Sequence, residues 1–221
     1  MPKTAIILGA TGLTGSFLLK RLIPDKNYEK IILFSRSATR VRSSKIEEHL
    51  IDMFELGKHR DKFKGNVVFC CIGTTQKKTP NKEVYRKVDY GIPVTAAKLC
   101  AENNIESFLV ISALGADPKS RFFYNRTKGE MENAVLQNGI RNSYIFQPSL
   151  ISGERKEKRP LELIGKQLMK AANFVMFGPL KKYQSIHPDT IAKAMQQVAE
   201  HGYEKIRIES DEIKKLAQDD D

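Results

Sequence analysis

The amino-acid sequence predicts an α/β fold with a doubly wound parallel sheet. Short apolar runs that end at turn residues alternate with stretches of helical periodicity along most of the 221 residues. Strands that alternate with helices are joined by right-handed crossovers, so helices are expected to cover both faces of a parallel sheet. A chain of this length is expected to bury one core, which makes residues 1–221 a single predicted domain.

The positions of the elements follow from the spacing of apolar residues. Strands are expected where apolar runs are short, and helices where apolar residues recur at helical spacing. The expected strands are residues 4–8, 31–35, 49–52, 67–72, 107–112 and 142–147, with a last short strand near 205–209. The expected helices are about residues 12–23, 82–103, 124–138 and 189–201.

Two polar stretches interrupt this alternation. Residues 38–48 are polar and basic, which indicates a loop or a short exposed helix. Residues 151–188 begin with a charged loop and continue with an apolar helical pattern. We expect this segment to leave the sheet and to form the substrate-side wall of a pocket. The acidic residues at the end of the chain are expected to fray.

Composition and motifs argue against several classes of protein. The longest apolar run, residues 67–72, is far shorter than the roughly 20 residues of a membrane helix, so no membrane partner is expected. The first strand has no basic and apolar leader before it, so a cytoplasmic location is expected. The histidines are scattered, and no metal site is expected. Cys70, Cys71 and Cys100 are expected to be reduced, with a redox pair of the first two as the weaker alternative.

The net charge of +11 raises the alternative of nucleic-acid binding. The basic residues are spread along the chain, however, and no nucleic-acid-binding motif accompanies them. Solubility and the attraction of an anionic cofactor explain the charge more simply, so no dedicated nucleic-acid site is expected.

A glycine-rich junction follows the first expected strand. In AIILGATGLTG, residues 5–15, Gly9, Gly12 and Gly15 lie between a buried strand and an amphipathic helix. Such glycines allow a tight turn, a close approach of the backbone to a pyrophosphate, and close packing of helix on strand. The N–H groups that begin a helix also attract phosphate. This context favours a dinucleotide loop over a plain turn, although the G-x-x-G-x-x-G spacing differs from G-x-G-x-x-G.

The end of the second expected strand indicates which dinucleotide would bind. NAD-binding versions place an acidic residue about 20 positions past the glycines to hold the ribose 2′-hydroxyl, whereas an arginine there accommodates a 2′-phosphate. Ser35 and Arg36 occupy this place, and no carboxylate does. A guanidinium binds phosphate through two charge-assisted hydrogen bonds, so Arg36 favours NADP(H). The alternative is an arginine that is merely solvated in a loop.

Three side chains are expected near the carboxyl ends of the central strands, where this fold binds its cofactor, and they have the chemistry of carbonyl reduction. Ser112 ends the fifth expected strand, and the next helix carries Tyr124 and Lys128 on one face. A tyrosine has an ordinary pKa of about 10 and is a poor acid or base at neutral pH unless a cation lowers that pKa. Lys128 would supply the cation, and Ser112 would hydrogen-bond the substrate oxygen. His187 is expected to start a helix, with a substrate contact as the alternative.

The segments GATGLTG, SALGAD and YNRTK resemble the extended or atypical branch of the short-chain dehydrogenase/reductase superfamily. More narrowly, VVFCCIGTTQKK, YNRTKGEMENAV, YIFQPSLISGERKEKRP and IHPDTIAKAM resemble its Tat-interactive-protein group, along nearly the whole chain. The resemblance implies a Rossmann fold that binds NAD(P). It implies cofactor contacts from Gly9, Thr11, Gly12, Leu13 and Thr14 at the pyrophosphate, Arg36 at the adenosine phosphate, Asp52 and Met53 near adenine, Cys71, Gly73 and Thr74 along the adenine ribose, and Pro148 and Leu150 at the nicotinamide. Gly15, Ser35, Tyr124 and Lys128 complete the expected cofactor set.

Two functions of different classes fit these residues. The first is an NADP(H)-dependent oxidoreductase that acts on a small carbonyl or alcohol substrate, with Tyr124 as acid and base. The second is a regulator that binds NADP(H) together with a protein partner, or with a second copy of the chain, and has little or no catalysis. Many active members of the resembled family carry asparagine near the place of Asp89, and this departure favours the second function.

Overall fold

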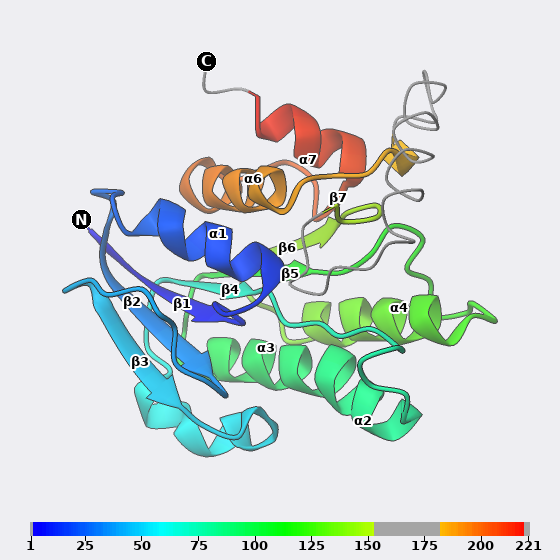
Figure 1. Cartoon of the computed structure of the whole chain (residues 1–221), viewed down its shortest axis with the longest axis horizontal. Helices are drawn as coiled ribbons and strands as arrows, with labels where there is room; N and C mark the ends of the chain where they lie inside the picture. The colour runs from blue at the N-terminus through cyan, green and yellow to red at the C-terminus, as the bar shows by residue number, and fades with distance from the viewer. Residues whose placement is uncertain (1, 153–181, 219–221) are drawn as a thin grey trace.

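The computed structural model describes residues 2–152 and 182–218, and at its centre is a parallel sheet of seven strands (Figure 1). The strands are β1 (Lys3–Leu8), β2 (Tyr28–Ser35), β3 (Ile46–Leu50), β4 (Val67–Cys70), β5 (Ser107–Ile111), β6 (Asn142–Gln147) and β7 (Arg207–Glu209). Their order across the sheet is β3-β2-β1-β4-β5-β6-β7, so the winding reverses at β1, between β2 and β4. The doubly wound parallel sheet predicted from the sequence is confirmed.

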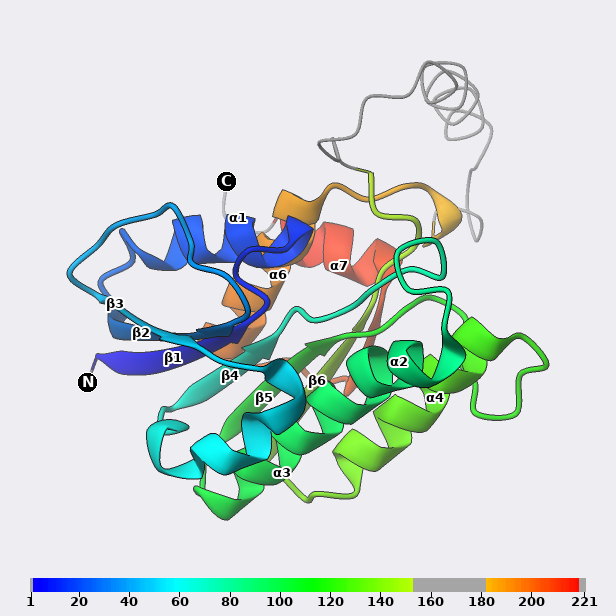
Figure 2. The same ribbon diagram turned by 60° about the horizontal axis from the view of Figure 1, so that its bottom comes forward.

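Helices cover both faces of this sheet. They are α1 (Leu13–Leu22), α2 (Lys82–Arg86), α3 (Ile92–Glu102), α4 (Phe123–Leu136), α6 (Pro188–His201) and α7 (Ser210–Leu216), with a 3-10 segment, η1 (Met53–Lys62), and a π-helical turn, η2 (Lys87–Gly91). The helices α1, α6 and α7 lie on one face of the sheet. The helices α2, α3 and α4 lie on the other face, which is turned forward in Figure 2.

Alternation of side chains along the strands divides the core into two parts. Ala5 and Ile7 of β1 belong to the part that includes α1, α6 and α7, whereas Ile6 and Leu8 belong to the part that includes α3, α4 and η1. All four side chains are fully buried. A strand that is covered on both faces is apolar at every position, which explains the unbroken apolar run before Gly9.

Several elements begin or end elsewhere than the sequence predicts. The strand expected at 49–52 begins earlier, as β3, and the strand expected at 67–72 ends at Cys70. The helix expected over 82–103 is divided into α2, η2 and α3. Pro93 has no N–H to donate to the carbonyl of Asp89, four residues before it. One regular α-helical hydrogen bond is therefore missing at η2, where the helix widens into a π-helical turn. The sequence does not predict α7, which begins with a capping box between Glu209 and Glu212.

The expected excursion, residues 151–188, is described only at its two ends, because residues 153–181 lie outside the described part of the chain. The two ends lie side by side: Ile151 and Ile186 form a parallel bridge, and Ser149 Oγ donates a hydrogen bond to the carbonyl of Gln184. The chain therefore leaves and rejoins the fold at one place, close to the end of β6. Of the helices in the described ranges, none is both long enough and apolar enough to cross a membrane.

Candidate functional site

A cavity of about 1260 Å³ lies at the carboxyl ends of the central strands. Its walls come from the segments that follow β1, β4, β5 and β6, which is where doubly wound sheets bind their ligands. Twelve of the residues predicted for the site line this cavity: Thr11, Gly12, Leu13, Thr14, Cys71, Gly73, Thr74, Ser112, Tyr124, Lys128, Pro148 and Leu150. The structure thus brings together residues that are up to about 140 positions apart in the sequence.

The glycine loop joins β1 to α1 without a side chain at its tightest points. Gly9 has a φ of +86°, and the N–H of Gly12 donates to the carbonyl of Gly9 at 2.9 Å. A Cβ on Gly15 would lie 2.2 Å from that same carbonyl oxygen, so only glycine permits the helix to approach this closely. Gly12 is the N-cap of α1 and, being a glycine, has no side chain that could accept a hydrogen bond from the first N–H groups of the helix. The first N–H groups of α1 are therefore available to an anion in the cavity.

The residues predicted to contact adenine and the adenosine phosphate, Ser35, Arg36, Asp52 and Met53, do not line the cavity. β2 pairs with β1 up to the positions of Leu8 and Phe34, so Ser35 and the exposed Arg36 follow directly beside the glycine loop. Ser35 is buried, and its hydroxyl donates to the carbonyl of Ser37 at 2.9 Å.

Asp52 and Met53 have structural contacts of their own. Asp52 caps η1 by accepting a hydrogen bond from the N–H of Phe54 at 2.9 Å, and Met53 is buried in the core. Their place near adenine stays a prediction.

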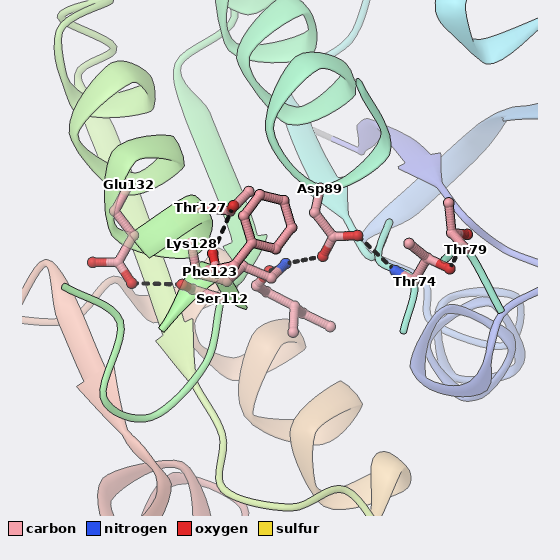
Figure 3. Close-up of polar contacts among 9 residues, drawn as sticks. Thr74, Thr79, Asp89, Ser112, Phe123, Thr127, Lys128 and Glu132 are labelled. Atoms are coloured by element: carbon pink, nitrogen blue, oxygen red, sulfur yellow. Dashed lines mark hydrogen bonds and ion pairs between the residues drawn. The ribbon is translucent and has the colours of Figure 1, made fainter. Parts of the chain in front are cut away.

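A buried ion pair crosses the floor of the cavity (Figure 3). The ammonium of Lys128, on α4, lies 2.9 Å from Asp89 Oδ1, on η2, and the two side chains are only 4% and 1% exposed. The second carboxylate oxygen of Asp89 accepts the backbone N–H of Thr74 at 2.8 Å. Burial alone would lower the pKa of Lys128, but the charge and hydrogen bond of Asp89, together with Tyr124 and Cys70, outweigh it, so the pKa is raised and the lysine stays charged.

The phenol of Tyr124 does not have the lowered pKa that the sequence suggested. Partial burial raises the pKa of Tyr124, Lys128 acts in the opposite direction, and Asp89 raises the pKa further. Lys128 therefore acts on Tyr124 in the expected direction, but in the protein without ligand it does not bring the pKa of the phenol below its ordinary value. The physical reason is the burial of the phenol, which is the largest effect, and the carboxylate of Asp89 adds to it.

The hydroxyl of Ser112 is also bound within the protein. It donates a hydrogen bond to Glu132 Oε1 at 2.5 Å, and Figure 3 shows this contact on the far side of Lys128 from Asp89. Both residues are buried. Glu132 was not among the predicted site residues, although it follows Tyr124 and Lys128 at the same spacing of four along α4, a signal that could have found it.

Tyr85 is a second residue that the sequence analysis missed. It lies on α2, is 1% exposed, and lines the cavity. Its hydroxyl oxygen is buried and has no hydrogen-bond partner among the residues that the structure describes. No motif marks this tyrosine, because its neighbourhood depends on how α2 folds against α4.

The remaining predictions for the site concern a histidine and three cysteines. His187 is the N-cap of α6 and accepts the N–H of Asp189, as expected for a helix start. The three cysteines are free, and burial raises the pKa of Cys70 to about 12, which does not suit a redox thiol. The described residues contain no group of three or more side chains that could ligate a metal.

This geometry defines a class of protein: a Rossmann protein of the short-chain dehydrogenase/reductase type. The family model described as "NAD dependent epimerase/dehydratase family" matches residues 5–208, and the chain belongs to this family. Protein HTATIP2 of Rattus norvegicus is 30% identical over 169 residues, which are 75% of this chain and 69% of that protein. This similarity confirms the resemblance to the Tat-interactive-protein group.

Mitochondrial proteins of fungi are also similar to this chain. "Protein FMP52, mitochondrial" of Meyerozyma guilliermondii is 37% identical over 154 residues, which are 69% of this chain and 66% of that protein. The match thus spans just under two thirds of that relative's length. The same name is given to relatives in Candida albicans and Aspergillus niger. These names contradict the predicted cytoplasmic location. That prediction rested on the lack of a secretory leader, which carries no information about import into mitochondria.

Solved structures with the same fold have low sequence identity to this chain. MoeE5 in complex with UDP-glucose and NAD superposes with a TM-score of 0.68 at 16% identity and covers 98% of this chain and 81% of its own. WbmG of Bordetella bronchiseptica in complex with NAD has a TM-score of 0.69 at 13% identity, over 99% of this chain and 78% of its own. At these identities the likeness shows the fold alone.

Substitution of Gly15 tests the geometry of the loop. In Gly15→Ala, the new Cβ meets the Gly9 carbonyl oxygen at 2.2 Å, so the loop must shift. We expect the free energy of unfolding to fall by about 1–3 kcal/mol and NAD(P)H binding to weaken. Thermal unfolding and cofactor fluorescence measure the two effects. Gly57→Ala is the control, because its Cβ would meet nothing closer than 3.7 Å; equal behaviour of the two variants would contradict the role of Gly15.

Proposed function

We propose that this protein is an NADP(H)-dependent oxidoreductase that acts on a small carbonyl or alcohol substrate, with Tyr124 as acid and base. The observation that carries the proposal is that Tyr124, Lys128 and Ser112 line the same cavity as the glycine loop. The family match supports a dinucleotide in this cavity. Because Tyr124 is 38% exposed, a ligand in the cavity can reach its ring and hydroxyl.

Each residue has a chemical role in this proposal. When bound, the nicotinamide ring supplies or accepts a hydride. Tyr124 Oη then donates a proton to the carbonyl oxygen, or removes one from the alcohol in the opposite direction. A raised pKa keeps this phenol protonated at neutral pH, which suits proton donation. Lys128 stays charged and stabilises the tyrosinate that forms after the proton has left.

Arg36 is the residue that supports NADP(H) rather than NAD(H). It is exposed and follows the end of β2, beside the glycine loop, at the sequence position where NAD-binding versions carry a carboxylate. The guanidinium offers several N–H donors in one plane, which match the oxygens of a phosphate.

We further propose that residues 1–221 form one domain and that the excursion at 151–188 contributes to the substrate side. Ile151 and Tyr183, from the described ends of the excursion, line the cavity. MoeE5 was solved with UDP-glucose, and UDP-glucose therefore belongs among the candidate substrates to be screened.

A second candidate function is a regulator that binds NADP(H) and has little or no catalysis. The observation that favours it is that the ammonium of Lys128 and the proton of Ser112 are each held by a buried carboxylate, those of Asp89 and Glu132. Such a regulator would act with a protein partner or with a second copy of the chain.

Substitution of Tyr124 distinguishes the two functions. In Tyr124→Phe, the ring is kept and the proton donor is lost, so we expect NADPH oxidation to fall by about 100-fold or more while NADPH binding stays within about threefold. NADPH absorbance is followed with a panel of aldehydes, ketones and UDP-glucose, and NADPH binding is followed by fluorescence.

Tyr90→Phe is the matched control, because Tyr90 lies on η2 and stacks with Arg86 rather than lining the cavity. Turnover that persists in Tyr124→Phe would contradict the role of Tyr124. Tight NADPH binding without turnover of any compound by the unaltered protein would favour the regulator.

Substitution of Arg36 tests the choice of cofactor. We expect Arg36→Ala to raise the Kd for NADPH by roughly 10- to 100-fold and to leave the Kd for NADH nearly unchanged, because only NADPH has the 2′-phosphate. Arg141→Ala removes an equal charge from an exposed site at the start of β6 and is the control. Equal weakening of both cofactors, or no weakening, would contradict NADP(H) preference.

A further inference from the structure

The contact between Ser112 and Glu132 determines what Ser112 can offer a ligand. A serine hydroxyl has one proton to donate and two lone pairs that accept. In this structure the proton is donated to Glu132 Oε1 at 2.5 Å. A hydrogen bond from a hydroxyl to a carboxylate is stronger than one to a neutral oxygen, so the proton of Ser112 is held away from the cavity.

Glu132 is itself fixed by residues from two other elements. Gln147 of β6 donates from Nε2 to the same carboxylate oxygen at 2.8 Å. Arg207 of β7 donates from Nε to the second oxygen at 2.8 Å. Glu132 is 2% exposed. A buried carboxylate whose two oxygens both have partners keeps a single position, because any rotation would leave a buried charge without hydrogen bonds.

We propose that Glu132 is a positioning residue that sets the hydrogen-bond polarity of Ser112, so that only acceptor lone pairs of Ser112 Oγ face the cavity. A ligand oxygen that contacts Ser112 must then bring its own proton, as an alcohol does and a carbonyl does not. The inference rests on the proposed function only in taking this cavity as the substrate site. It assigns the donor to a carbonyl oxygen to Tyr124 alone, and leaves Ser112 to contact a proton-bearing group of the ligand other than the hydroxyl whose proton passes to Tyr124.

The polarity of Ser112 can be measured without a substrate or a cofactor. In Ser112→Cys, a thiol replaces the hydroxyl beside Glu132. Since a nearby carboxylate disfavours the thiolate, the pKa of the introduced thiol is expected to be raised. Adding Glu132→Gln removes the charge and keeps the shape, and we expect the pKa to fall by about 1–3 units. A change in packing alone would not produce this shift.

The rate of alkylation by iodoacetamide, read at position 112 by fragment mass spectrometry across a range of pH, gives the pKa of the thiol in the full chain. Cys70 and Cys100 do not interfere, because burial raises the pKa of each to about 12. Ser112→Cys with Glu130→Gln is the matched control, since Glu130 is a carboxylate of the same helix that pairs with Arg86. This control should give the same pKa as Ser112→Cys alone.

An unchanged thiol pKa after Glu132→Gln would overturn the proposal. If that double variant does not fold, Arg207→Gln in the Ser112→Cys background takes its place, because Arg207 is 45% exposed on its side chain and balances the same carboxylate. The thiol pKa should then rise, and a constant or lower pKa would contradict the proposal. None of these outcomes depends on turnover, so they remain interpretable whatever Tyr124→Phe shows.

Discussion

The ion pair between Lys128 and Asp89 is the interaction on which the arrangement of the site depends. It joins α4 to η2 at 2.9 Å, and through the N–H of Thr74 it also holds the loop that follows β4. Removing two charges from water is costly, and the cost is offset only if the charges and their remaining hydrogen-bonding groups have partners. Loss of one partner of such a pair costs about 3–5 kcal/mol. The walls of the cavity that carry Gly73 and Tyr124 therefore hold their positions together.

The same ion pair changes the chemistry of the site. Lys128 lowers the pKa of Tyr124, but burial of the phenol and the carboxylate of Asp89 together outweigh this effect, and the pKa stays raised. On the other side of Lys128, Glu132 holds the proton of Ser112. Two buried carboxylates thus fix a cation and a hydroxyl before any ligand arrives. Pre-organised groups of this kind avoid reorganisation during a reaction.

Local signals in the sequence were sufficient for the sheet and for the glycine loop. An apolar run predicts a buried strand because both faces of the sheet are covered, and Gly9 and Gly15 are needed where a side chain would collide with the backbone. The spacing of Tyr124 and Lys128 predicted one helical face. The sequence marked Asp89 only as a departure from the asparagine that many members of the resembled family carry. Its ion pair with Lys128 depends on the π-helical turn η2 before Pro93, which no periodicity reveals.

Long-range contacts could not be predicted in the same way. Arg207 reaches Glu132 from a strand 75 positions later, and only the folded sheet brings the two together. The buried hydroxyl of Tyr85, which has no hydrogen-bond partner within the described ranges, likewise depends on packing between helices. The cellular location was predicted wrongly, because it is determined by targeting signals that cellular receptors recognise and not by the packing of the fold.

The central claim is that burial of the phenol, together with Asp89, outweighs the charge of Lys128, so that Tyr124 is not acidic in the ligand-free protein. The most direct test is the pKa of Tyr124 itself, measured by NMR of ring-labelled tyrosine, with Tyr124→Phe to assign the signal. The account predicts a pKa above the ordinary value of about 10. A pKa clearly below that value would mean that Lys128 outweighs both burial and Asp89, and would contradict the account.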